Sequence, residues 1–284
     1  MATLITGVSK IATATPAAFC NAAVKGSLAL NYNQQRRPAV AQKVSVFKGI
    51  QEATLNLSGC YGIAKTDLVK WFPTTAGLQV AAFPDFFVEC VDGTKWTITA
   101  CQPGAAKVSL GADLQSIVEW DLTLRGIATE ASAGASATAP YTSLGHFNRN
   151  AVATTIATAT RGLVSFDLNN GLDCKGIILG DTAGTAGHMT EPEGYDVQLS
   201  ADGVTITLGT EQTWDATWNA DTNTPFSVVI ALTNGTSGEN QTYTATNFVV
   251  NSKDIPFETT DGRTVYAHTL GIDTGNLFGR IALT

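Results

Sequence analysis

The residue types that most often do chemistry in proteins are few in this sequence and stand far apart. The three histidines, His146, His188 and His268, have no metal-ligand spacing such as H-x-x-x-H. Glu191 and Glu193 are close enough to be paired carboxylates, but the proline between them and the glycine after them indicate a turn, not a cleft that separates two pKa values. The sequence therefore predicts neither an acid–base pair nor a metal site.

The glycine-rich stretch 180–187 is the other candidate for a binding motif. It lacks the Lys-Ser/Thr pair of a phosphate-binding loop and opens no helical pattern. The G-x-S-x-G nucleophile motif is absent from the sequence. We therefore expect that the protein is not an enzyme and needs no cofactor.

The five cysteines are odd in number and lack the paired spacing of a metal site; they are Cys20, Cys60, Cys90, Cys101 and Cys174. Reduced, packed thiols are the simplest interpretation. A Cys90–Cys101 bridge across a hairpin stays open as an alternative.

Composition favours a packed protein with a weakly charged surface. Hydrophobic residues make up 44% of the chain, which is enough for a sizeable core, while only 14% of residues are charged. The net charge is −7, with 11 Lys/Arg against 9 Asp/Glu in residues 1–142 and 6 against 15 in residues 143–284. No basic arm that would grip nucleic acid is visible. The N-terminus lacks a secretory signal pattern and no long apolar run occurs, so we expect no membrane partner.

The elements that would position any site are mainly strands. Residues 117–125 alternate between apolar and polar, as do residues 54–58, 164–168 and 204–208, and this period of two is typical of half-buried strands. Five dipeptides supply the backbone freedom of tight hairpins; they are Asp92-Gly93, Asn170-Gly171, Asp202-Gly203, Asn234-Gly235 and Asp261-Gly262. The pattern predicts a meandering antiparallel sheet.

Helical signals are scarce. One short helix is expected after Thr66 as its N-cap, ending before Pro73 and lying across a sheet. A weaker helical pattern covers residues 144–157.

The chain divides most naturally in its middle. Residues 129–140 consist mostly of small residues, which predicts a linker. The linker would join a first β domain (25–128) to a second (141–284), and residues 1–24 would form an N-terminal arm. At an offset of 110 residues, Asp92-Gly93 aligns with Asp202-Gly203, which suggests that the second domain duplicates the first.

Two residue groups could make intermolecular contacts. Arg36, Arg37, Lys43 and Lys48 form the one basic cluster, which we interpret as a contact with the acidic second half of a neighbouring copy. Trp214 and Trp218 could form a carbohydrate platform, although packing in a core or interface is the simpler interpretation.

Four segments carry a resemblance to a known family. Residues 48–59, the short helix around Trp71 with residues 117–126, and the closing residues 248–270 resemble the tail tube (major tail) proteins of long-tailed bacteriophages. The resemblance implies two tandem antiparallel domains of the β-sandwich or part-barrel type, with a short flanking helix. It also implies stacked trimeric or hexameric rings, contacts with other tail proteins, and a lumen through which DNA passes without specific binding.

The resemblance also suggests roles for particular residues. The polar strand faces carrying Glu119, Asp121, Ser165 and Asp167 become candidates for the lumen lining, because a conduit for DNA should be smooth and mildly acidic. The protein would belong to the virion tail and would assemble in the cytoplasm of a bacterial host. The alternatives are another virion protein (decoration, baseplate or head–tail joining) or a carbohydrate-binding β-sandwich module.

Overall fold

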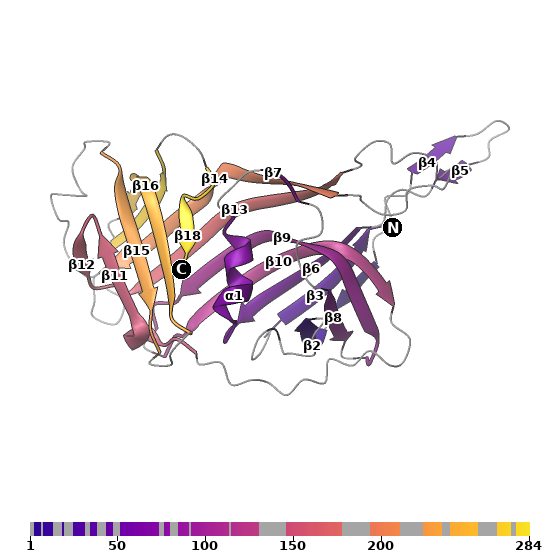
Figure 1. Ribbon diagram of the computed structural model, residues 1–284, viewed down its shortest axis with the longest axis horizontal. Helices are drawn as coiled ribbons and strands as arrows, with labels where there is room; N and C mark the ends of the chain where they lie inside the picture. Colours follow the sequence, from indigo (N-terminus) through magenta and orange to yellow (C-terminus); the bar gives the residue numbers. More distant parts are fainter. Residues whose placement is uncertain are drawn as a thin grey trace.

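One large antiparallel sheet dominates the molecule (Figure 1). The computed structural model describes residues 3–6, 8–13, 19, 25–31, 35–38, 44–47, 52–73, 77–79, 85–90, 92–113, 115–130, 146–177, 194–210, 224–234, 239–254, 266–273 and 277–284. Among these residues, sixteen strands belong to the large sheet, and β4 (Gln35–Pro38) and β5 (Val44–Phe47) form a separate two-stranded ribbon. The predicted mainly β, antiparallel class is confirmed.

The main path of the sheet crosses both halves of the sequence. From end to end its order is β1 (Thr3–Thr6), β3 (Lys25–Asn31), β6 (Glu52–Cys60), β10 (Val118–Glu130), β9 (Lys95–Leu110), β13 (Ser165–Ile177), β14 (Gly194–Thr210), β17 (Tyr266–Ile272), β16 (Gln241–Asp254), β15 (Phe226–Leu232), β11 (Val152–Ile156) and β12 (Ala159–Arg161). Off this path, β2 (Val8–Thr13) pairs with β8 (Phe86–Cys90), β8 with β9, β7 (Gly77–Gln79) with β14, and β18 (Ile281–Leu283) with β16.

The two halves of the chain join where β9 pairs with β13, from Leu110 opposite Phe166 to Lys107 opposite Asn169. Buried apolar residues of both halves also share one core cluster. Most of the predicted linker lies outside the described residues, so the division into two domains stays a prediction. The internal duplication gains no support from the pairing, because β6 pairs with β10, whereas the strands at matching offsets, β13 and β15, do not pair with each other.

The core forms because the sheet folds back over its apolar face. Along β10 the even-numbered side chains from Val118 to Ala128 are buried, whereas the odd-numbered ones up to Ile127 are only partly so. Buried Trp120 donates a hydrogen bond from Nε1 to the hydroxyl of Tyr243 on β16 at 2.9 Å. This contact joins the two layers across the core.

A short helical segment covers part of the apolar face, as Figure 1 shows. It comprises α1 (Lys65–Leu68) and the 3₁₀ turn η2 (Val69–Trp71), which confirms the predicted short helix. The predicted N-cap is wrong: Ala64 caps α1 with extended backbone, and its carbonyl accepts from the N–H groups of Asp67 and Leu68. Trp71 is buried, and its Nε1 donates to the carbonyl of Thr123 at 3.0 Å, which fixes the segment on β10.

The weaker helical pattern at 144–157 is a wrong prediction. Its described residues form a single 3₁₀ turn, η3 (Arg149–Ala151), which leads directly into β11. The Arg149 guanidinium donates to the carbonyls of Gly111, Ala112 and Asp113 in the β9–β10 connection and to that of Val164. These long-range contacts hold the segment and override the local helical preference.

The five dipeptides predicted to form hairpin turns differ in what the structure shows. Asp92-Gly93 forms the predicted turn between β8 and β9, with Gly93 at a φ of +85°. Asn234 follows β15, and Asp261-Gly262 lies outside the described residues. Asn170-Gly171 and Asp202-Gly203 are wrong as turns, because they lie inside β13 and β14 and face each other at a β-bulge.

The bulge explains the need for glycine at position 171. Its φ is +62°, and a Cβ there would stand 2.6 Å from the backbone nitrogen of Val204. The close approach of the two strands therefore requires the same residue type that a turn would.

Four thiols are packed inside the molecule: those of Cys60, Cys90, Cys101 and Cys174. Burial raises the pKa of the Cys101 thiol to about 12. Cys20 lies outside the described residues. In the part of the chain that the structure describes, no helix is both long and apolar enough to span a bilayer.

Candidate functional site

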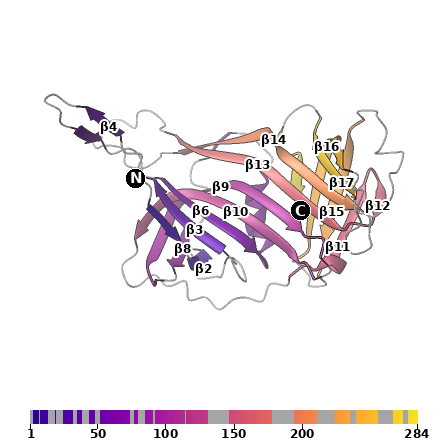
Figure 2. The same ribbon diagram turned by 180° about the vertical axis from the view of Figure 1, so that it is seen from behind.

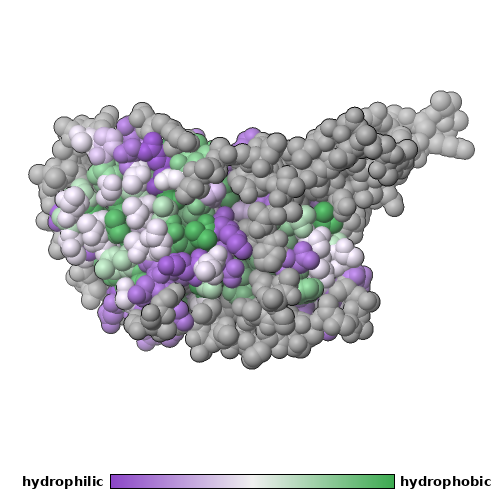
Figure 3. All heavy atoms as spheres, in the orientation of Figure 1, coloured by the Kyte–Doolittle hydropathy of each residue, from purple (hydrophilic) through white to green (hydrophobic). Residues whose placement is uncertain are grey.

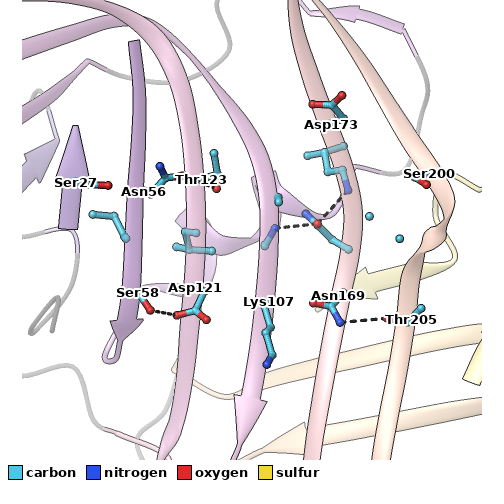
Figure 4. Close-up of a pocket in the computed structure, with 18 of the residues that line it drawn as sticks. Ser27, Asn56, Ser58, Lys107, Asp121, Thr123, Asn169, Asp173, Ser200 and Thr205 are labelled. Atoms are coloured by element: carbon cyan, nitrogen blue, oxygen red, sulfur yellow. Dashed lines mark hydrogen bonds between the residues drawn. The ribbon is translucent and has the colours of Figure 1, made fainter. Parts of the chain in front are cut away.

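Among the described residues a hollow lies on the sheet face opposite the core, and we call it the polar groove. It has a volume of about 850 Å³ and crosses β3, β6, β10, β9, β13 and β14 (Figure 4). Most of its lining residues have polar side chains, among them Ser58, Lys107, Asp121, Asn169, Asp173 and Thr205. None of its described lining residues is aromatic. Seen from behind, these strands run side by side (Figure 2).

Strand alternation builds the groove directly from the sequence pattern. Because even-numbered residues of β10 point into the core, Glu119, Asp121 and Thr123 point to the opposite face. On β13, Ser165 and Asp167 likewise alternate with the buried Phe166. The four predicted lumen candidates thus lie on one face, although they come from opposite halves of the chain.

Cross-strand register places these candidates close together. Glu119 on β10 and Asp167 on β13 both lie opposite Ser109 of β9, one on each side. Asp121 lies opposite Lys107, which is opposite Asn169. Two adjacent rows of polar side chains therefore run across the strands.

Asp121 is fixed by β6. Its Oδ1 accepts hydrogen bonds from the hydroxyl of Ser58 at 2.7 Å and from the N–H of Gly59 at 2.9 Å. Figure 4 shows Ser58 and Asp121 meeting across the two strands. The carboxylate is therefore held in place at the groove surface.

The cations in the middle of this face are each paired with carboxylates. Nζ of Lys107 lies 2.9 Å from Oδ1 of Asp167. Arg125, on the same face of β10, has Nη1 3.4 Å from Oε1 of Glu52 and Nη2 3.5 Å from Oδ1 of Asp173. These ion pairs link β9 to β13, and β6 to β10 and β13.

Asn170 closes the groove floor where β9 and β13 separate. Its Oδ1 accepts from the N–H groups of Ala106 and Leu172, and its Nδ2 donates to the carbonyls of Trp71 and Gly104. The side chain is 4% exposed, and it uses two acceptor and two donor positions. The main-chain pairing of β9 with β13 ends at Asn169 opposite Lys107, and the hydrogen bonds of the Asn170 side chain take its place beyond that point.

The predicted intermolecular contacts lie elsewhere. Arg36 and Arg37 belong to β4 of the ribbon, which projects away from the large sheet (Figure 1). Lys43 and Lys48 lie outside the described residues, as do Trp214 and Trp218. The structure therefore does not bring the described part of the basic cluster to the groove.

Sequence reasoning missed Lys107, Asn170 and Asp173. Lys107 follows Pro103-Gly104, and proline and glycine are not typical of the interior of a strand. Asn170 and Asp173 flank a glycine that indicates a turn. Arg125 belongs to the alternating segment 117–125. Like Asp121 it has an odd number, so the alternation places both side chains on the groove face.

Metal binding finds no support in the described residues. Among them, no cluster of three or more His, Cys, Asp or Glu side chains could hold an ion. His146 is exposed, His268 is buried in β17, and His188 is outside the described residues.

Comparison with known proteins gives no family. No protein-family model matches the chain, and no curated protein matches it.

Proposed function

We propose that this protein is the structural subunit of a phage tail tube, and that it polymerises as stacked rings around a lumen that conducts DNA. The observation that carries the proposal is the continuous sheet with one packed face and one polar, grooved face across six strands. A subunit that lines a conduit needs this combination, because one face must hold the fold together while the other meets a hydrated polymer.

The polar groove suits contact without retention. Three aspartates and two lysines line it, so the face is mildly acidic; they are Asp121, Asp173, Asp202, Lys25 and Lys107. Fixed positive charge would hold a phosphate backbone through counterion release. The absence of aromatic side chains from its described lining also removes the usual stacking platform for bases or sugars.

The sheet ends suit closure into a ring. β1 and β12 stand at the two ends of the path, and among the described residues each pairs with a single strand. An exposed strand edge has unpaired backbone groups that can pair with another chain. Pairing of such edges between copies would satisfy these groups and drive assembly. The proposed rings are trimeric or hexameric.

The β4–β5 ribbon and the N-terminal arm are the elements we assign to contacts between copies. The ribbon reaches away from the sheet, and Arg36 and Arg37 on β4 would meet the acidic second half of a neighbour, together with Lys43 and Lys48 (Figure 2). The weakly polar surface over β15 and β16, pale in Figure 3, is inexpensive to desolvate in repeated contacts. In this proposal the protein has no enzymatic activity or cofactor, has other tail proteins as partners, and reaches the virion tail after assembly in the host cytoplasm.

Thr160 on β12 gives a direct test of edge pairing. Ala157 and Thr158 both have positive φ, so they form a two-residue hairpin turn in which Ile156 and Ala159 are the hydrogen-bonded pair. The next pair, Thr155 and Thr160, is therefore not hydrogen-bonded, and the N–H of Thr160 points to the open edge.

A proline at this position would remove that donor without breaking the β11–β12 ladder. In sedimentation velocity, the wild type and Thr160→Val should assemble, whereas Thr160→Pro should remain unassembled while keeping its circular dichroism spectrum. Assembly of Thr160→Pro to the wild-type extent would refute edge pairing through β12.

A further inference from the structure

The cations beside the polar groove are held in a particular way. Among the described residues, Lys107 has one carboxylate partner, Asp167, at 2.9 Å. Arg125 has two partners in the same part of the chain, Glu52 and Asp173, at 3.4 and 3.5 Å. The partners come from neighbouring strands of the same face, so the register of the sheet itself delivers each carboxylate to its cation.

The Lys107–Asp167 and Arg125–Asp173 pairs add little to folding. The side chains of Lys107 and Asp167 are 39% and 44% exposed, and that of Asp173 is 61% exposed. Ion pairs this open to solvent contribute little to stability because water and salt screen them. Their effect on an approaching polyanion is electrostatic, since each carboxylate offsets the charge of the ammonium or guanidinium that it faces.

We infer that Asp167, Asp173 and Glu52 act as built-in counter-ions that prevent Lys107 and Arg125 from binding nucleic-acid phosphates. The inference rests on the proposed function for its meaning, since a conduit for DNA must not retain it. A phosphate reaching this face would have to displace a carboxylate that is already positioned by the sheet. Lys25, at the first residue of β3, is exposed, and with the other unaltered cations of the chain it contributes the residual affinity that all variants share.

The test measures DNA binding by the full chain, diluted until sedimentation velocity shows that it is unassembled. The probe is a short fluorescein-labelled DNA duplex, followed by fluorescence anisotropy over a series of salt concentrations. Asp167→Asn should bind the duplex several-fold more tightly than the wild type at low salt. Its plot of log affinity against log salt concentration should be steeper by about 0.9, the value for one additional phosphate contact.

The two carboxylate partners of Arg125 allow its ion pairs to be removed one at a time. Asp173→Asn alone should have a smaller effect than Asp167→Asn, because Glu52 still holds the guanidinium. The Glu52→Gln/Asp173→Asn double variant should recover an effect comparable to that of Asp167→Asn.

Two controls separate released cations from a change in net charge. Asp202→Asn removes the same charge from the groove lining, but Asp202 has no ion pair with any described residue, so affinity should change little. Adding Lys107→Gln to Asp167→Asn should return binding to the wild-type value. Equal tightening by Asp167→Asn and Asp202→Asn, or no tightening by either, would overturn the inference. Since the assay uses unassembled protein, that result would leave the tube proposal to be judged by assembly alone.

Discussion

The carboxamide of Asn170 accepts a hydrogen bond from the N–H of Ala106 at 2.8 Å, at the point where β9 and β13 part. The same side chain donates to the carbonyl of Trp71 at 2.8 Å. One buried residue therefore ties together the groove floor, the neighbouring strand and the helical segment that covers the core.

Asn170→Asp should destabilise the unassembled chain strongly. A carboxylate cannot donate to the carbonyls of Trp71 and Gly104, and the new charge would be buried, so we expect a loss of about 3 kcal/mol or more in the free energy of unfolding. Urea denaturation measures the loss. Asn169→Asp is the matched control, because Asn169 is only half-buried and its partner, the Thr205 hydroxyl, can donate to a carboxylate. Equal losses in both variants would contradict the role of Asn170.

Tyr243→Phe should break the contact between the two layers of the core. The Tyr243 hydroxyl accepts from Trp120 Nε1 and donates to Gln241 Oε1 at 3.0 Å, so its removal leaves both buried groups unpartnered. We expect a loss of about 2 kcal/mol at neutral pH. Tyr266→Phe, at a half-buried tyrosine, should cost much less in the same urea assay.

The same tyrosine should make stability depend on alkaline pH. Burial raises the pKa of Tyr243, so the unfolded chain loses this proton first, near pH 10. The stabilising contribution is complete below that pH, and above it the wild type should lose about 1.4 kcal/mol per pH unit relative to Tyr243→Phe. A difference between the two proteins that stays constant from pH 8 to pH 11 would contradict this.

The β11–β12 hairpin should tolerate improvement. Ala157 and Thr158 have φ angles of 47° and 75°, which cost free energy in residues that carry a Cβ. Replacing them with Asn and Gly, the preferred pair for this turn, should raise the free energy of unfolding by about 1 kcal/mol. Thermal denaturation tests this, with Thr160→Val as a neutral control, and a lower melting temperature in the Asn-Gly variant would refute it.

The strand faces could be predicted from the sequence because alternation is a local signal. The polar odd-numbered and apolar even-numbered residues from Val118 to Arg125 place Glu119 and Asp121 on one face without any knowledge of the neighbours. The helix around Trp71 was predictable for a similar reason, since Pro73 marks its end.

The rest depended on contacts distant in sequence. Gly171 and Gly203 serve a bulge, and only the other strand reveals that their backbone freedom is used within β13 and β14 and not at turns. The pairing of Lys107 with Asp167 depends on the register of β9 against β13, which no local pattern encodes. Arg149 likewise finds its carbonyl partners across 36 to 38 residues of sequence, in the β9–β10 connection.

Negative-stain electron microscopy of the purified wild-type chain tests the central claim most directly. If sister copies complete the sheet edges, the images should contain rings or tubes with a central channel. A field of uniform single molecules, under conditions in which the chain is folded and concentrated, would contradict the account.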